Sequence, residues 1–291
     1  NLRYNTSVIA PQLDQLMPLP DNTSANFQYI GNPNLVPQYD HRISLGFHLF
    51  DNFNFTSLFA NVNTTISNNR IVYRTTVDEN LFETVEPVNT DNYRDIGAYL
   101  SFSKPFKPLK LKYRLRSRIR LANYDSFINT LKSNVIDNNM NVRFAVSNRK
   151  TEKVLVEAGI AMDFSNRKYG IDPDFNQSYQ NTQYFLTTEF YIKGGWTIVS
   201  DIDYTSYSDG SFQDAPSYYL WRASISKLLW DDKLELSISA HDILNQNIGY
   251  RRTGNSQSVQ QIEYKTLGQF FMVGLNYRIG KAREGGGMRV E

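Results

Sequence analysis

The chain has 291 residues, a formal net charge of +2 and no cysteine. The low net charge argues against a nucleic-acid-binding domain, which is usually strongly basic, and the lack of cysteine excludes disulfides, thiol catalysis and zinc–thiolate sites. No stretch approaches the ~18 to 20 consecutive apolar residues of a membrane helix. Aromatic residues make up 14% of the chain and its mean hydropathy is −0.47. That combination fits a soluble β protein or a membrane β-barrel, whose signal per strand is weak.

Along the chain, apolar and polar residues alternate in runs of about ten, which is the period of a β-strand. No segment of useful length has a helical period, so the chain is predicted to be nearly all β. Residues 1–39 are expected to hold the end of a strand and a long loop. Eleven strands are predicted after them, at 41–50, 53–73, 93–103, 109–121, 135–146, 154–164, 183–193, 196–206, 217–229, 234–241 and 269–279.

The connections between these strands alternate between short and long. The short ones are 51–52, 104–108, 147–152, 194–195 and 231–232, and the long ones are 76–92, 122–134, 165–182, 207–216 and 242–268. An outer-membrane barrel has this arrangement, with tight periplasmic turns at one rim and long extracellular loops at the other. We therefore predict an antiparallel transmembrane β-barrel, with residues 1–39 as extracellular loop and strand end, 40–280 as barrel wall and 281–291 as a periplasmic tail.

The predicted strand "LKLKYRLRSRIRL" at 109–121 has one apolar and one cationic face. Lys or Arg facing lipid costs ~2 to 4 kcal/mol each at the midplane, so the cations should face the lumen. These six residues are Lys110, Lys112, Arg114, Arg116, Arg118 and Arg120.

Neighbouring strands offer Asp95, Asp137, Glu157 and Asp163 on the lumen side, too few to neutralise six cations. Either a separate domain inside the barrel supplies the missing acids, or the wall is locally positive. The cations could line a path for an anionic substrate, but we favour a structural role in which they face such an interior domain.

Three motifs stand out: "GNPNLVPQ" at 31–38, "AHDILNQNIGYRR" at 240–252 and "GQFFMVGLNYRIGK" at 268–281. Together they resemble TonB-dependent outer-membrane receptors, which usually have Glu at the position of Gln38. The "YRIGK" ending resembles the branch with a carboxypeptidase-regulatory-like N-terminal domain. The resemblance implies a barrel of about 22 strands, a plug in its lumen and a TonB box. With about eleven strands and neither plug nor TonB box, the chain looks like the C-terminal half of such a barrel.

The resemblance implies ligand uptake across the outer membrane, driven through TonB. The expected partners are outer-membrane lipid, an N-terminal plug and barrel half, TonB, and a surface lipoprotein as a further candidate; nucleic acid is not expected. The alternative function is a non-transporting, receptor-like barrel that acts as a scaffold subunit of an outer-membrane complex. An open wall of eleven strands would leave two edges that a bilayer does not tolerate, which also favours a missing half.

Other candidate sites are weaker. Aromatic and Arg residues on presumed outer loops could form a ligand or partner surface; they are Tyr207, Phe212, Tyr218, Tyr250, Arg251 and Arg252. The three histidines have no ligand spacing, and no nucleophile, base and stabiliser gather on one rim. We therefore predict no enzyme, no metal site and no cofactor. Asp242, Asn245 and Gln246 are better explained by a local turn than by binding.

Overall fold

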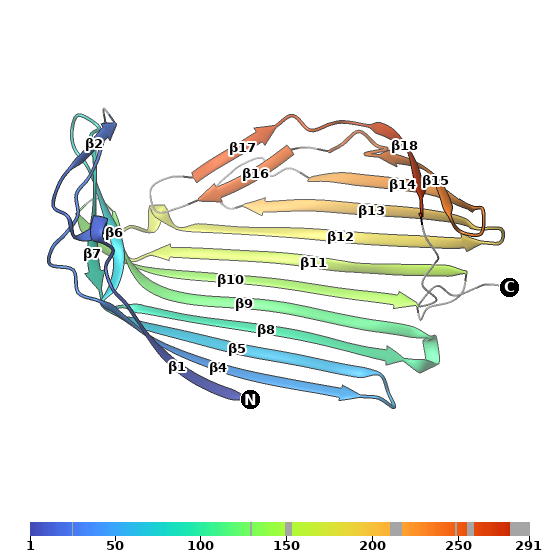
Figure 1. The fold of residues 1–291 in the computed structure, drawn as a ribbon, viewed down its shortest axis with the longest axis horizontal. Helices are drawn as coiled ribbons and strands as arrows, with labels where there is room; N and C mark the ends of the chain where they lie inside the picture. The colour runs from blue at the N-terminus through green and yellow to red at the C-terminus, as the bar shows by residue number, and fades with distance from the viewer. Residues whose placement is uncertain are drawn as a thin grey trace.

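Twelve strands form one antiparallel sheet in a computed structural model of the chain, which describes residues 1–24, 26–128, 130–148, 153–209, 217–247, 249–254 and 259–279. Figure 1 shows this sheet as a long curved wall from β1 to β18. In pairing order its strands are β1 (Leu2–Ile9), β4 (Gln38–Asp51), β5 (Thr56–Asn68), β8 (Tyr93–Phe106), β9 (Leu111–Ile128), β10 (Leu131–Asn148), β11 (Val154–Tyr169), β12 (Gln177–Ile192), β13 (Trp196–Asp209), β14 (Ser217–Leu229), β15 (Leu234–His241) and β18 (Phe270–Tyr277).

Two insertions interrupt this meander. Four strands form a small sheet at one end of the wall (Figure 1), in the order β2 (Asp21–Ser24), β3 (Phe27–Tyr29), β7 (Glu83–Thr90) and β6 (Arg70–Val77). The connection from β15 to β18 contains the hairpin β16 (Gly249–Gly254) and β17 (Val259–Tyr264). The helical elements are short: α1 (Leu13–Leu16), η1 (Lys107–Leu109) and η2 (Pro173–Phe175). In the described part of the chain, no helix is long and apolar enough to cross a membrane.

Side-chain alternation explains why these segments pair as they do. One row across five neighbouring strands consists of Phe102, Leu115, Phe144, Ile160 and Tyr184, which lie directly opposite one another in the register. A slip by one residue would move every one of these side chains to the other face. The apolar face is largely exposed, as in β18, where the exposed fraction of Val273 is 83%. So broad an apolar surface requires a non-aqueous neighbour.

The predicted sidedness of the connections is present, but two of the predicted long loops are wrong. Residues 122–134 extend β9 and β10, which remain paired as far as Ile128 and Leu131. Likewise β11 continues to Tyr169 and β12 begins at Gln177, inside the loop predicted at 165–182. The polar side chains of these extensions resemble those of loops, so the sequence pattern did not show them. The strands continue because backbone hydrogen bonds form wherever both strands remain in register, whatever their side chains.

Opposite the long connections, tight turns join the strands at the other end of the wall (Figure 1). Gly194 and Gly195 have φ of +83° and +78°, which a residue with a Cβ rarely adopts. The predicted strand at 109–121 begins later than expected, since Lys110 lies in the turn with φ 52° and β9 starts at Leu111.

The wall is one strand larger than the eleven strands predicted, because β1 pairs with β4 along its whole length. β1 and β18 are the two ends of the pairing order, and no pairing between them occurs among the described residues.

Candidate functional site: a charged interior wall

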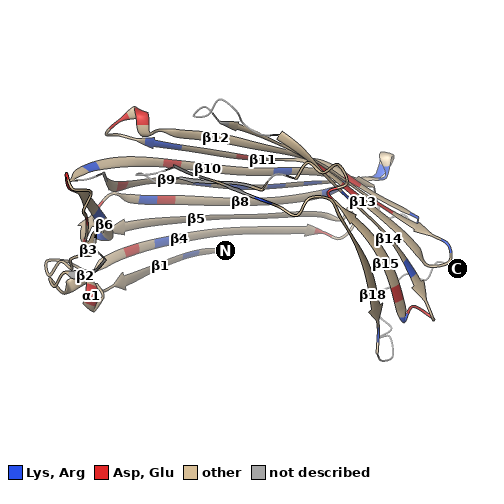
Figure 2. Ribbon diagram, turned by 90° about the horizontal axis from the view of Figure 1, so that it is seen from above, with Lys and Arg blue, Asp and Glu red and all other residues tan. Residues whose placement is uncertain are grey.

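The face opposite the apolar one carries most of the charged residues in the membrane part of the strands. Figure 2 marks the positions of all Lys, Arg, Asp and Glu residues along the ribbon. On β8–β11 the cations on this face outnumber the carboxylates, with Lys112, Arg114, Arg116, Arg118, Arg120, Arg143 and Arg167 against Asp95, Asp137, Glu157 and Asp163. We call this the cationic region. Of the six cations expected from the sequence, Lys110 is not in it because it lies in the turn.

Three of these arginines, Arg114, Arg120 and Arg167, are paired with acids. The Nε atom of Arg120 lies 2.6 Å from Asp95, and its Nη1 lies 3.7 Å from Asp137. Arg114 forms an ion pair with Glu157. Asp137 is buried and is shared with Arg167, whose Nη2 lies 3.0 Å away. The paired cations are thus those toward the two ends of the row.

The middle of the cationic region lacks compensation. Arg116 lies directly opposite Arg143 across the β9–β10 ladder, and like charges in that position repel. Within the described residues, neither Arg116 nor Arg143 forms an ion pair, and the fourth carboxylate, Asp163, accepts a hydrogen bond from Asn141 instead. The two arginines line a hollow of about 350 Å³, together with Arg114, Ala145 and Glu157.

Aromatic rings support some of the cations. The guanidinium of Arg143 lies 3.8 Å from the ring centroid of Phe185, and that of Arg118 lies 5.9 Å from the ring of Tyr99. Gly159 makes room for the first contact, since a Cβ at this position would lie 2.5 Å from the Phe185 ring. Both contacts hold the guanidinium groups without neutralising them, so this wall can still bind an anionic partner.

The same face of β12–β15 has the opposite balance. Its described charged side chains are four acids and one cation, Glu189, Asp201, Asp203, Glu235 and Arg222. We call this the acidic region. Arg222 is paired with Asp203 at 2.9 Å, and Asp201 accepts a hydrogen bond from Thr187 at 2.8 Å. The interior wall therefore has a positive and a negative part side by side.

Sequence reasoning missed Arg143, Arg167 and the acidic region. Arg143 has the parity of Asp137 on the same predicted strand, so the alternation rule could have found it. Arg167 fell in a segment predicted to be a loop. Asp201 and Asp203 share a parity in the sequence, but only the register places them beside Arg222.

The expected outer surface is only partly described. Tyr207 and Tyr218 lie in strands β13 and β14 instead of loops, on the charged face, with ring centroids 6.5 Å apart. Phe212 lies outside the described residues. Tyr250, Arg251 and Arg252 lie on β16, where the backbone alone is described. Of the six residues predicted for this surface, the structure thus brings together Tyr207 and Tyr218.

Burial and hydrogen bonds organise the outer rim beyond the apolar belt. Asp40 is buried and accepts hydrogen bonds from Gln38 and Ser67, at 2.8 and 2.7 Å, and an ion pair from Arg42. Burial raises the pKa of Asp40, but these three partners outweigh it and hold the pKa below its usual value. Arg70 packs over the Tyr93 ring, 3.5 Å from its centroid. Side-chain contacts therefore connect neighbouring elements at this rim, next to the charged face.

The first two sequence motifs have structural roles. A Cβ on Gly31 would lie 2.3 Å from the carbonyl oxygen of Met17, and Asn32 donates to the Pro87 carbonyl at 3.1 Å. Asp242 is buried, and its carboxylate accepts from the backbone N–H groups of Gln246 and Asn247. These residues order loops. No group of three His, Asp or Glu side chains that could hold a metal ion occurs in the described part of the chain.

Comparison with known proteins agrees with this architecture. A comparison with curated proteins found no match. The model of the family described as "Outer membrane protein beta-barrel family" matches residues 1–277. The apolar exposed face, the charged opposite face and the sided connections are what such a barrel requires. The chain therefore belongs to the outer membrane protein beta-barrel family and lies in the outer membrane.

Proposed function

We propose that the chain forms the C-terminal part of the barrel of a TonB-dependent receptor, which takes up a ligand across the outer membrane. Arg116 opposite Arg143, with no acid paired to either among the described residues, is the observation that carries this proposal. Like charges directly opposite each other destabilise a sheet unless another part of the protein supplies acids between them. A folded plug domain in the lumen would supply them.

The edges of the wall support a larger barrel. In a bilayer every backbone N–H and C=O must be paired, so membrane sheets close on themselves. β1 and β18 end the pairing order, and among the described residues no further strand pairs with the outer edge of either. Further strands of the same protein would pair with β1 and β18, and the closed barrel would be wide enough to enclose a plug.

The charge pattern also favours one folded partner over loose counter-ions. A plug with an acidic side toward the cationic region and a basic side toward the acidic region would dock in one orientation. The receptor proposal includes no catalytic step. TonB would act on the plug segment, which is where the energy of uptake would enter.

A photo-crosslinking residue in place of Arg116, in the full-length protein assembled in outer membranes, tests this proposal. We expect it to capture an acidic segment of a globular domain of the same polypeptide, whereas the same residue in place of Val142, on the lipid side, captures none. The purified protein should also bind the periplasmic domain of TonB. Failure to crosslink such a domain, together with no binding of TonB, would contradict the proposal.

The small sheet β2–β3–β7–β6 favours a second candidate function, a scaffold in an outer-membrane complex. Strand β3 pairs in parallel with β7, so two separate loops form one ordered unit on the long-loop side. Such a unit could hold a surface lipoprotein. Co-purification of a stoichiometric partner, without TonB binding, would favour this function.

A further inference from the structure

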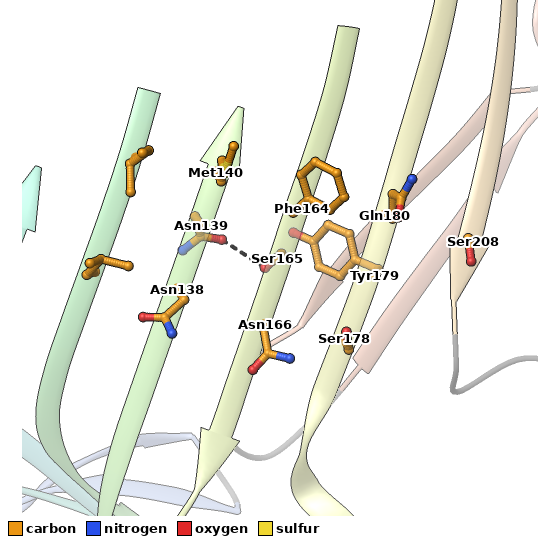
Figure 3. A pocket seen from close by; sticks show the side chains of 12 residues that line it. Asn138, Asn139, Met140, Phe164, Ser165, Asn166, Ser178, Tyr179, Gln180 and Ser208 are labelled. Atoms are coloured by element: carbon orange, nitrogen blue, oxygen red, sulfur yellow. Dashed lines mark hydrogen bonds between the residues drawn. The ribbon is translucent and has the colours of Figure 1, made fainter. Parts of the chain in front are cut away.

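A groove of about 450 Å³ lies on the lipid-facing side of β9–β13 (Figure 3). Most of its lining residues have the parity of the apolar face. They are Ile119 and Leu121 on β9, Asn138 and Met140 on β10, Phe164 and Asn166 on β11, Ser178 and Gln180 on β12, and Ser208 on β13. The groove therefore faces the membrane and not the lumen.

The groove lies where the apolar belt ends. In the register, Ile119, Met140 and Phe164 form one row. The next row outward contains Asn138 and Asn166, on the side where the long connections lie. A barrel places that side outside the cell, so the groove lies at the level of the headgroups of the outer leaflet.

The polar side chains that the groove shares with the apolar face have almost no partners in the protein, whereas Asn139 and Ser165, of the opposite parity, bond to each other at 2.8 Å. Within the described residues, the side chains of Asn138, Asn166, Ser178 and Ser208 form no hydrogen bond, and Gln180 donates only to Thr182, at 3.1 Å. Amide and hydroxyl groups offer both donors and acceptors. None of the residues lining the groove is charged.

We propose that this groove binds a lipid of the outer leaflet that has an uncharged sugar headgroup. The amides of Asn138 and Asn166 would exchange hydrogen bonds with the sugar hydroxyls, while the acyl chains continue along Ile119 and Phe164. No cation lines the groove itself, and the next one on this face, Lys168, lies one row further out. A phosphate within the groove would therefore lack the arginine or lysine that normally binds it.

Lipid retention tests this site in the full-length protein. We would exchange the protein into nanodiscs of phosphatidylcholine that contain either a glycosyl diacylglycerol or phosphatidylglycerol, with identical acyl chains, and count the retained lipids by native mass spectrometry. The wild type should retain the glycosyl lipid preferentially. The double variant Asn138→Leu/Asn166→Leu should lower this preference about thirtyfold, since it removes two hydrogen bonds that contribute ~1 kcal/mol each.

Asn68→Leu is the matched control. Asn68 is an exposed amide at the outer end of β5, on the same face but outside the groove, and its variant should retain the wild-type preference. Equal retention of phosphatidylglycerol by the wild type would overturn the proposal, as would equal loss in the control. Full competition by free methyl glucoside would also contradict it, because the acyl chains would then contribute nothing. The wild-type comparison decides the matter even if the double variant does not assemble.

Discussion

The cationic region on β8–β11 and the acidic region on β12–β15 are parts of one wall and follow the same alternation of side chains. They differ in whether their charged side chains have partners within the wall. In the acidic region the single arginine, Arg222, has a carboxylate partner, and Asp201 has a hydroxyl donor. In the cationic region, Arg116 and Arg143 face each other without an acid. The alternation rule thus assigns a side chain to a face, but it does not ensure that every charge on that face has a partner of opposite sign.

This difference indicates where a partner would contribute most. A charge with a partner in the wall is already satisfied, and a second partner adds little because the first one screens it. An uncompensated cation beside another cation gains from any acid that approaches. The opposed arginines Arg116 and Arg143 are therefore the point at which an acid of the proposed plug would contribute most.

The largest expected effect comes from placing a cation on the lipid-facing side of the wall. It tests which face is lipid-facing, and the comparison of the two regions depends on that assignment. Phe144→Arg in β10 and Ile202→Arg in β13 should each lower the unfolding free energy by ~2 to 4 kcal/mol, since both would place a cation in lipid. Asn141→Arg and Thr205→Arg, on the opposite face of the same strands, should change it by less than ~1 kcal/mol. Urea unfolding in lipid vesicles measures all four. Equal effects on both faces would break the comparison.

The next effect separates the two regions directly. Asp137 is 3% exposed in its side chain and is shared by Arg120 and Arg167. Asp137→Asn therefore removes the carboxylate beside Arg167 and leaves Arg120 with Asp95 as its acid. We expect a loss of about 2 kcal/mol, below the cost for a fully buried pair because the arginines are partly exposed. Asp203→Asn should cost no more than ~1 kcal/mol, since its partner Arg222 is 44% exposed. A larger loss for Asp203→Asn would reverse the comparison.

Particular residues show how far the sequence predicts this site. Arg114 and Arg120 were placed on the charged face from parity alone, because strand alternation is local. Their acids, Glu157 and Asp137, had the correct parity too, but which arginine pairs with which acid depends on the register of two hairpins. The parallel pairing of β3 with β7 joins segments more than fifty residues apart, and no local pattern encodes such a contact.

Lowering the pH should measure how much the hydrogen-bonded carboxylate of Asp40 contributes to stability. Asp40 lies at the rim, outside both regions, and serves as a reference for an acid that has partners. The pKa of Asp40 is lower in the folded protein than the unfolded value of about 3.9. Its contribution to stability is therefore fully present above pH ~4 and is lost as the pH falls through the folded pKa. Between pH 7 and pH 3, the unfolding free energy of the wild type should fall more than that of Asp40→Asn. Parallel pH profiles for the two proteins would show that Asp40 is not held by its three partners.

The smallest expected change in unfolding free energy is the one that tests the opposed arginines Arg116 and Arg143 most directly. Arg116→Gln removes one of two opposed charges, so a wall without its plug should become more stable by up to ~0.5 kcal/mol. Arg114→Gln should instead destabilise that wall slightly, because Glu157 loses its partner. With the proposed plug in the lumen the sign for Arg116→Gln should reverse, since the acids of that plug would lose their contact. Urea unfolding of the full-length protein and of the wall alone measures both signs. The same sign in both forms would mean that Arg116 meets no acid in the lumen, and the local positive charge would then belong to an open, water-filled wall.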